Sequence, residues 1–318
     1  MPHTAPRAPI RAAVFAATLA VVVTFALAGF AAGARAEVID ITDIPAYPDL
    51  YGPESAPEAP RDLVLLDAEL VEIAVALGAA DRILARPAAI DLPGIEETPY
   101  KVRDWAGVEG IVGMRPGKVL TANVRFDTLR AGLERVGIDT DIVNRTRPAT
   151  EKVALMAGHL GLEDRGAALI AQMRQSYADA AAESGVGAGG APLRILHASK
   201  QGAGGNFSAG GAGTGVHNLI ERVGAVNAAA EVGMDRYRSV TPEGVLMMAP
   251  DVILISESEL EAFGGVDGIW EGYPGLAQTP AGRGARAIVM QDLHVRADAA
   301  SSGLATRALA GALAEMFP

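Results

Sequence analysis

The sequence contains no cysteine. That absence excludes disulfide bonds, thiolate metal ligands and cysteine nucleophiles, and it excludes a lipid attached to cysteine at the end of a leader. Without disulfides, the folded chain must be stable through its hydrophobic core alone. Basic residues are also scarce, with 27 Lys and Arg against 38 Asp and Glu and a formal net charge of −11. A chain this acidic is a poor candidate for binding DNA or RNA, which requires a basic face.

Long apolar runs are confined to the N-terminus. An uncharged stretch from Ala12 to Ala34 follows Arg7 and Arg11, and the tripeptide Ala-Arg-Ala ends it at 34–36. This pattern predicts a cleaved signal peptide over 1–36 and a soluble periplasmic protein without a lipid anchor. An uncleaved membrane anchor is the alternative, because the run is long enough to span a bilayer. The leader carries three Arg and no acid, so its removal changes the net charge from −11 to −14.

Several common catalytic motifs are missing. The sequence has no P-loop and no G-x-S-x-G motif. Beyond the leader it has four histidines, none within metal-site spacing of another: His159, His197, His217 and His294. His197 stands in the apolar segment "RILHAS", so we expect a buried histidine whose hydrogen bonds are satisfied.

Strand-like and helix-like segments alternate along most of the chain, which favours parallel α/β layers. The proline-rich residues 37–61 are predicted to form an extended arm, and 62–150 a first α/β lobe. Residues 151–185 read as nearly all helix, broken around Gly161. The alternation resumes in a second α/β lobe over 186–318. We therefore expect two α/β lobes joined by one long helix.

A glycine-rich segment, "QGAGGNFSAGGAGTGV", lies between a strand and a helix of the second lobe. Its glycines could hold a pyrophosphate at the helix start, as in an NAD(P)-dependent oxidoreductase. The spacing Gly211-x-Gly213-x-Gly215 differs from the G-x-G-x-x-G of dinucleotide-binding folds. A flexible loop at the edge of a cleft is the favoured interpretation.

One phrase occurs twice, as "GVEGIVGMRPGKVL" from Gly107 and as "TPEGVLMMAPDVIL" from Thr241. Both read as a helix, then a proline, then a buried strand, with Glu109 and Glu243 at matching positions. Core packing explains the matching apolar residues. For the two acids, helix capping and a shared function are equally compatible with the pattern.

An aromatic and cationic loop precedes each copy of the phrase. The first contains Tyr100, Lys101, Arg103 and Trp105, and the second contains Tyr237 and Arg238. Phenolate oxygen suits ferric iron, and Lys or Arg pairs with carboxylates, so such loops can hold a flat anionic ligand across a cleft. Ordinary exposed loops are the alternative.

Residues 63–318 resemble the periplasmic haem-binding proteins of ABC importers. These lie within the helix-linked class that also binds cobalamin and ferric siderophores. The most similar segments are "GAGTGVHNLIERVGAVNAA", "YRSVTPEGVLMMAPDVILI" and "GGVDGIWEGYPGLAQTPAGR". The resemblance implies a monomeric, non-enzymatic protein that holds haem between its lobes. It would deliver haem, as transported ligand and not as catalytic cofactor, to an inner-membrane permease dimer.

The resemblance also implies roles for individual residues. Tyr100 would bind the haem iron axially, although Pro99 replaces the family's glycine and the spacing to Glu109 is two residues longer. Gln201 stands where some relatives have a histidine, so a second axial ligand is not expected there.

The other implied contacts are to the haem propionates and to the permease. Arg103, Arg238 and Lys101 would pair with the propionates, and Glu109 and Glu243 would dock onto the permease. A ferric siderophore or corrinoid is the alternative ligand. An exported oxidoreductase and a structural protein are the alternatives of other classes.

Overall fold

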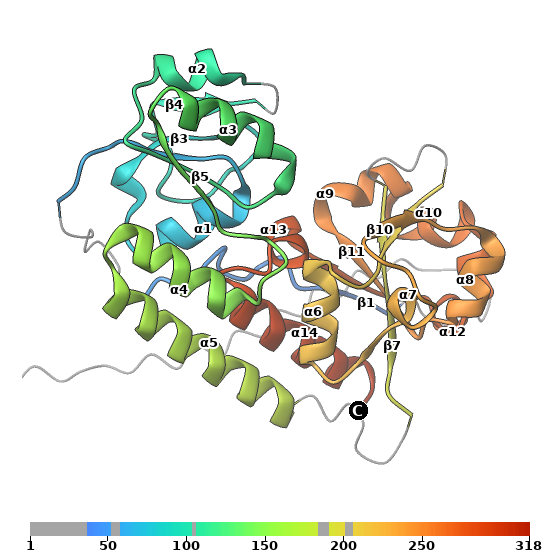
Figure 1. Ribbon diagram of the computed structural model, residues 1–318. Helices are drawn as coiled ribbons and strands as arrows, with labels where there is room; N and C mark the ends of the chain where they lie inside the picture. Colours follow the sequence, from blue (N-terminus) through green and yellow to red (C-terminus); the bar gives the residue numbers. More distant parts are fainter. Residues whose placement is uncertain (1–36, 52–57, 104–105, 184–190, 201–205) are drawn as a thin grey trace, which may run out of the picture. The chain divides into compact units, whose positions relative to one another are not determined.

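The structure is a computed structural model that describes residues 37–51, 58–103, 106–183, 191–200 and 206–318. The first sheet is entirely parallel, in the order β4-β3-β2-β5-β6 (Figure 1). Its strands are β2 (Leu63–Leu65), β3 (Ile83–Pro87), β4 (Tyr100–Val102), β5 (Lys118–Thr121) and β6 (Asp139–Ile142). The connecting helices are α1 (Ala68–Ala76), α2 (Val108–Gly113) and α3 (Asp127–Arg135), with 3₁₀ turns η1 (Ala80–Arg82) and η2 (Val124–Phe126).

The second sheet is mixed, in the order β1-β12-β11-β7-β8-β10, with β9 also paired to β7. Strands β1, β12, β11, β7 and β9 are parallel, whereas β8 runs antiparallel to both of its neighbours, β7 and β10. The strands are β1 (Glu37–Asp40), β7 (Arg194–Ser199), β8 (Ser208–Gly210), β9 (Val226–Asn227), β10 (Tyr237–Ser239), β11 (Val252–Ser256) and β12 (Arg286–Met290).

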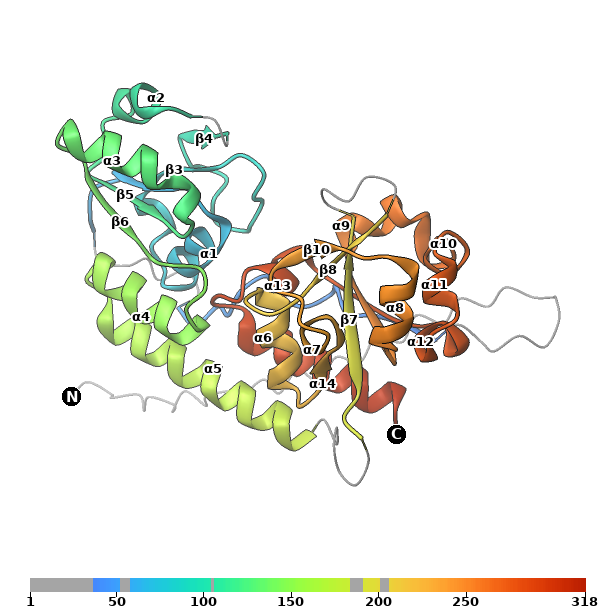
Figure 2. The ribbon, with the colours of Figure 1, turned by 45° about the vertical axis from the view of Figure 1, so that its right-hand side comes forward.

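The helices of this second part run from α6 to α14 (Figure 2). They are α6 (Gly215–Arg222), α7 (Ala228–Glu231), α8 (Pro242–Met248), α9 (Glu257–Leu260), α10 (Gly265–Glu271), α11 (Pro274–Ala277), α12 (Pro280–Gly284), α13 (Asp292–Arg296) and α14 (Ser302–Met316), with the 3₁₀ turn η3 (Glu261–Phe263).

Two consecutive helices connect the sheets, α4 (Ala149–Leu160) and α5 (Glu163–Glu183). Gly161 ends α4 in the left-handed conformation with φ of 63°, which glycine adopts without the strain of a Cβ atom. The break and the long second helix agree with the helical periodicity of the sequence. Figures 1 and 2 show α5 side by side with α14.

The arm contains a strand that the sequence did not predict. Glu37–Asp40 forms β1, which pairs in parallel with β12 at the edge of the second sheet. Farther along, Tyr47 packs against the core of the first lobe, and its hydroxyl donates to the Pro93 carbonyl at 2.9 Å. The arm is therefore attached to both lobes rather than only extended.

The repeated phrase has the same backbone course in both lobes. Helix α2 leads through Pro116 to β5, and α8 leads through Pro250 to β11. The residue before each proline, Arg115 or Ala249, has a positive φ, 55° and 42° respectively. Left-handed backbone is uncommon for residues other than glycine, so the two lobes share a specific turn as well as a pattern of apolar residues.

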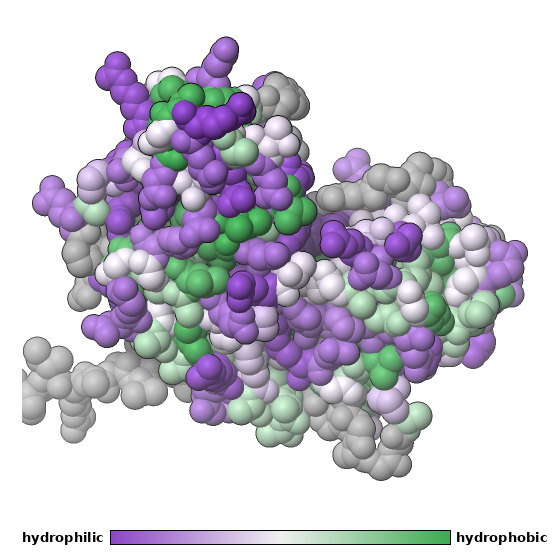
Figure 3. All heavy atoms as spheres, viewed as in Figure 1, coloured by the Kyte–Doolittle hydropathy of each residue, from purple (hydrophilic) through white to green (hydrophobic). Residues whose placement is uncertain are grey.

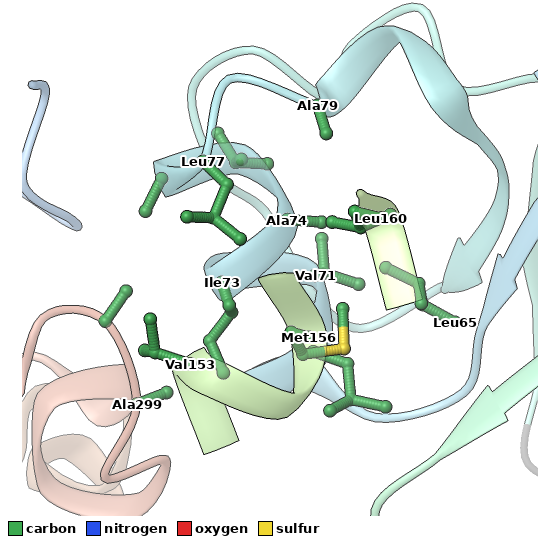
Figure 4. Close-up of a cluster of buried hydrophobic side chains, with 14 of the residues drawn as sticks. Leu65, Val71, Ile73, Ala74, Leu77, Ala79, Val153, Met156, Leu160 and Ala299 are labelled. Atoms are coloured by element: carbon green, nitrogen blue, oxygen red, sulfur yellow. The ribbon is translucent and has the colours of Figure 1, made fainter. Parts of the chain in front are cut away.

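The core of the first lobe lies between α1, α4 and the segment that precedes α14 (Figure 4). Ile73 of α1 points toward Val153 of α4, and Leu77, directly after α1, belongs to the same cluster as Met156, at the three- and four-residue spacings expected of packed helices. Ala299 packs against them although it follows the last strand of the second sheet. The C-terminal part of the chain thus completes the first core.

Two buried ionisable side chains hold this crossing segment. Lys152 of α4 donates to the Ala297 carbonyl at 3.0 Å, and Glu72 of α1 accepts the Ser301 amide. Both side chains are fully buried. Burial raises the pKa of Glu72 to about 8 and lowers the pKa of Lys152. Removing Glu72 or Lys152 would leave a backbone group of the crossing segment, or the remaining charge, without a partner in the core. The two side chains therefore fix the position of this segment.

The surface shown in Figure 3 is mostly hydrophilic, with scattered hydrophobic side chains and a small group of them over α2. Such scattered exposure is normal for folded proteins. Within the described ranges, none of the helices has the length and hydrophobicity needed to cross a membrane.

Candidate ligand-binding site

A cavity of about 420 Å³ lies where strands of both sheets end. In α/β folds ligands bind beyond the carboxyl ends of parallel strands, where the strand order reverses. That reversal falls between β2 and β5 in the first sheet and between β7 and β11 in the second. The residues that line the cavity are Ala46, Ala68, Glu69, Pro87, Ala89, Ile90, Asp91, Leu92, Arg145, Glu257, Gln291, Asp292, Leu293, Arg296 and Ala297.

Two buried acids lie at the reversal point of the first lobe, Asp67 and Glu69, and of these Glu69 lines the cavity. Asp67, directly after β2, accepts the Ala122 amide at 2.6 Å and so ties the ends of β2 and β5 together. Burial raises the pKa of Asp67 to about 6. Glu69 lies in the first turn of α1, and its Oε1 is 3.6 Å from Nε of Arg145, which follows β6. That separation exceeds a hydrogen bond, and Glu69 Oε1 has no hydrogen-bond partner among the described residues.

In the second lobe Arg296 lines the cavity, and Glu259 holds it from outside the lining. Glu259 Oε1 accepts from the Ser199 hydroxyl at 2.8 Å and from the Lys200 amide at 3.0 Å, which joins the ends of β7 and β11. Arg296 Nη2 lies 2.7 Å from Glu259 Oε2, and its Nε donates to Asp292 at 3.0 Å. Two carboxylates and the Ser199 hydroxyl thus hold this guanidinium in place.

Arg296 also faces Tyr237 of β10. Its guanidinium carbon is 5.5 Å from the centre of the Tyr237 ring. The ring packs edge-on against His197, with centroids 5.6 Å apart, and a Cβ atom at Gly210 would come within 3.2 Å of Tyr237 and 3.1 Å of His197. Glycine at position 210 therefore leaves the room in which the two rings pack.

The groups around Tyr237 change its pKa in opposite directions. Packing against the protein raises the pKa of Tyr237 to about 12, although 38% of the residue is exposed, and the nearby charge of Arg296 opposes the rise. The charge of Arg145, from the other lobe, acts in the same sense as that of Arg296. Tyr237 is therefore a neutral phenol in the free protein and faces cations that favour its anion.

His197 is buried as expected but not satisfied. Its residue has no exposed surface, and neither ring nitrogen has a hydrogen-bond partner among the described residues. Burial lowers the pKa of His197 to about 3, so the ring is neutral. The expectation of a hydrogen-bonded histidine was wrong, because β7 places the ring against Tyr237 and Gly210 rather than against an acceptor.

Comparison with known proteins gives the family. A model of the periplasmic binding protein family matches residues 63–292. The chain belongs to this family. The periplasmic haem-binding protein RhuT from Roseiflexus sp. RS-1 is 27% identical, with a TM-score of 0.69 over 81% of this chain and 99% of that one. The periplasmic haem-binding protein BhuT, solved with two haems, is also 27% identical, with a TM-score of 0.70 over 80% and 97% of the chains.

The haem-binding protein HutB of Vibrio cholerae has a TM-score of 0.68 over 81% of this chain and all of that one, and at 22% identity it supports the fold alone. No curated protein matches the chain. The predicted two-lobed α/β fold and the predicted family are confirmed. The family comprises transport binding proteins, which confirms the prediction of a protein that is not an enzyme.

The structure places the first predicted loop beside the cavity rather than in it. Tyr100 and Lys101 are exposed, Tyr100 by 44%, and neither contributes to the cavity lining. Arg103 lines a smaller hollow at the end of the same sheet, together with Val102 and Pro87, and Pro87 also borders the cavity. Trp105 lies outside the described residues, and so does Gln201.

The two predicted residues of the second loop lie in different surroundings, one near the cavity and the other in solvent. Tyr237 packs beside Arg296, whereas Arg238 is exposed and its Nε donates to the Asp235 carbonyl at 3.1 Å. Glu109 and Glu243 are exposed in the first turns of α2 and α8. The α8 cap is the Thr241 hydroxyl, which accepts the Gly244 amide at 3.1 Å, so Glu243 is not the capping side chain.

The glycine-rich segment is packed rather than a flexible loop, from Ser208 onward. A Cβ atom at Gly211 would lie 2.2 Å from the Met234 carbonyl oxygen, and one at Gly215 would lie 2.5 Å from that of Arg296. Thr214 caps α6 by accepting the His217 amide. These glycines allow close backbone approach within the lobe, so the geometry does not favour a pyrophosphate there.

Sequence reasoning missed Arg145, Arg296 and Glu259. The two arginines follow the last strand of their respective sheets, β6 and β12, and each faces a buried glutamate near the start of a helix. The sequence signal for the two arginines was their equivalent position in the two lobes. The aromatic residues near the repeated phrase indicated the two loops instead.

Proposed function

We propose that this protein captures haem in the periplasm and delivers it to an ABC importer. The carrying observation is the 27% identity to the haem-binding protein RhuT across 99% of that chain. The cavity supports the proposal, because it lies at the strand-order reversal of both sheets. Arg145 and Arg296 line it, and Tyr237 packs beside Arg296. Haem is here the transported ligand and not a catalytic cofactor.

Two tyrosines are candidates to bind the ferric iron, Tyr100 from the first lobe and Tyr237 from the second. Phenolate is a known haem ligand, and binding requires loss of the phenolic proton. The geometry supports Tyr237, because Arg296 lies 5.5 Å from its ring and counteracts the rise in pKa that burial causes, while His197 fixes the ring's orientation. Tyr100 is the iron ligand that the sequence resemblance implies, and it is the second candidate.

A hemin titration of the protein without residues 1–36 tests the function. We expect a Soret band, ferric tyrosinate charge-transfer bands and a complex whose mass shows the number of haems bound. Tyr237→Phe should abolish the charge-transfer bands while leaving the fold intact, and Tyr100→Phe should retain them. The reverse result would assign the iron to Tyr100. A wild type that ignores hemin but binds a ferric siderophore or corrinoid would refute haem as the ligand.

Glu109 and Glu243 are our proposed contacts with the permease. Both are exposed at equivalent positions of the duplicated phrase, and neither makes an ion pair within the described part of the chain. Two similar contacts suit a symmetric pair of membrane subunits, whose arginines would form charge-assisted hydrogen bonds to carboxylates. We further propose that the protein acts as a monomer.

A further inference from the structure

The charges that line the cavity are mostly negative. Glu69, Asp91, Glu257 and Asp292 contribute carboxyl groups, and among the described lining residues only Arg145 and Arg296 are cations. A ligand carboxylate that enters such a cavity loses water and approaches acids. It therefore needs a cation whose hydrogen-bond donors are not already used.

Arg296 meets that need less well, because its Nε and Nη2 donors are already used. Its Nε donates to Asp292 at 3.0 Å, and its Nη2 donates to Ser199 at 3.1 Å and contacts Glu259 at 2.7 Å. Its side chain is 19% exposed. Two carboxylates already neutralise this guanidinium, so its role is to hold the second lobe's side of the cavity and to face Tyr237.

Arg145 has the opposite environment. Its side chain is 46% exposed, and its ion-pair partner among the described residues, Glu69, is 3.6 Å away, too far for a hydrogen bond. Its backbone is nevertheless fixed, because its amide donates to the Ala122 carbonyl at 2.8 Å and its carbonyl accepts from Lys152 at 3.4 Å. Lys152 also holds Ala297 of the same cavity, so a rigid base carries an adaptable guanidinium.

We infer that Arg145 binds a carboxylate of the ligand and makes the cavity select a carboxylate-bearing tetrapyrrole. The inference rests on the proposed function and adds the residue that recognises the propionates. A guanidinium can bind a carboxylate through two parallel hydrogen bonds, which are shorter and stronger than its present contact with Glu69. Arg103, Arg238 and Lys101, which the sequence nominated for this task, do not line the cavity.

The experiment compares hemin with hemin dimethyl ester, which lacks the carboxylates but retains the iron and the ring. Dissociation constants are measured for the wild type, Arg145→Met and Arg145→Lys. Arg147→Met is the matched control, because Arg147 lies two residues away, outside the cavity lining, and pairs with Glu151 at 3.0 Å. An Arg103→Met, Arg238→Met double variant tests the competing assignment.

We expect esterification to weaken binding to the wild type and to Arg147→Met by about tenfold or more, as for a charge-assisted hydrogen-bonded pair. Arg145→Met should lose a similar factor for hemin, and esterification should then have little further effect. Arg145→Lys should recover part of the loss, with the tyrosinate bands unchanged throughout. Full ester discrimination in Arg145→Met, or its loss only in the double variant, would overturn the inference. A wild type that binds neither compound would instead overturn the proposed function itself.

Discussion

At the residue scale, His294 shows how one missing hydrogen-bond partner determines a protonation state. The ring is 3% exposed, and Nε2 lies 3.1 Å from the Pro45 carbonyl oxygen. A carbonyl can only accept, so Nε2 carries the proton. Nδ1 has no partner among the described residues, and protonation would bury a second N–H group without an acceptor. Burial accordingly lowers the pKa of His294 to about 4.

This histidine should make the protein sensitive to mild acid. The folded pKa of about 4 is below the unfolded value of 6.5, so between these pH values the unfolded chain binds more protons. The free energy of unfolding should fall as the pH drops through this window, by about 3 kcal/mol from this group. Urea titrations from pH 7 to pH 4 should show a shallower decline for His294→Gln. Equal declines in the wild type and in His294→Gln would show that His294 does not cause the acid sensitivity.

The cavity arginines show why site residues were harder to predict than fold. Arg145 and Arg296 stand in polar segments that resemble ordinary loops, and nothing local distinguishes them from Arg147 or Arg238. Their importance comes from long-range partners, Glu69 for the first and Glu259 for the second. Only the pairing of strands shows that the segments after β6 and β12 end at one cavity.

At the element scale, β1 shows the same limit for secondary structure. The alternation of strands and helices from Asp62 onward was predictable, because each element buries an apolar face of characteristic period. The segment Glu37–Asp40 has four residues and a charge at each end, and its pairing partner is Arg286–Val289 near the other end of the chain. Its strand structure depends on that partner, so local sequence favoured only an extended arm.

If β1 is a structural part of the second lobe, the side chains of Ile39 and of Ile41, directly after the strand, should matter more than that of the half-buried Val38. Ile39 and Ile41 pack against the core cluster of that lobe. The double change Ile39→Ser with Ile41→Ser should lower the free energy of unfolding by about 2–3 kcal/mol, from the apolar area lost. Val38→Ser, one residue away and on the opposite face of the strand, should cost less than half as much. Equal losses per residue in urea unfolding would show that β1 contributes only as a tether.

At the scale of the whole molecule, the chain forms two α/β lobes that share buried parts. Residues Ala297–Ser302 leave the second sheet, contribute Ala299 and Ala300 to the first core, and lead into α14. Glu72 and Lys152 hold their backbone from the first lobe. Asp298 reaches the other way, to Asn218 at 2.7 Å and to Arg222, both on α6. A connection with this many buried polar contacts favours limited movement between the lobes.

Limited movement between the lobes matters for docking. Glu109 and Glu243 lie on different lobes, so the spacing between them is constant only if the lobes do not move relative to each other. Glu109→Ala with Glu243→Ala should leave the melting temperature and the hemin spectrum nearly unchanged, since both side chains are exposed and neither makes the cap of its helix. The same pair of changes should sharply reduce haem-stimulated ATP hydrolysis by the importer in proteoliposomes.

Glu163→Ala with Asp267→Ala is the matched control, because it removes two exposed acids from the first turns of α5 and α10 and changes the net charge equally. Similar loss of stimulation in both double variants would point to net charge. Normal stimulation in the first would leave the repeated Glu-Gly without a role in docking.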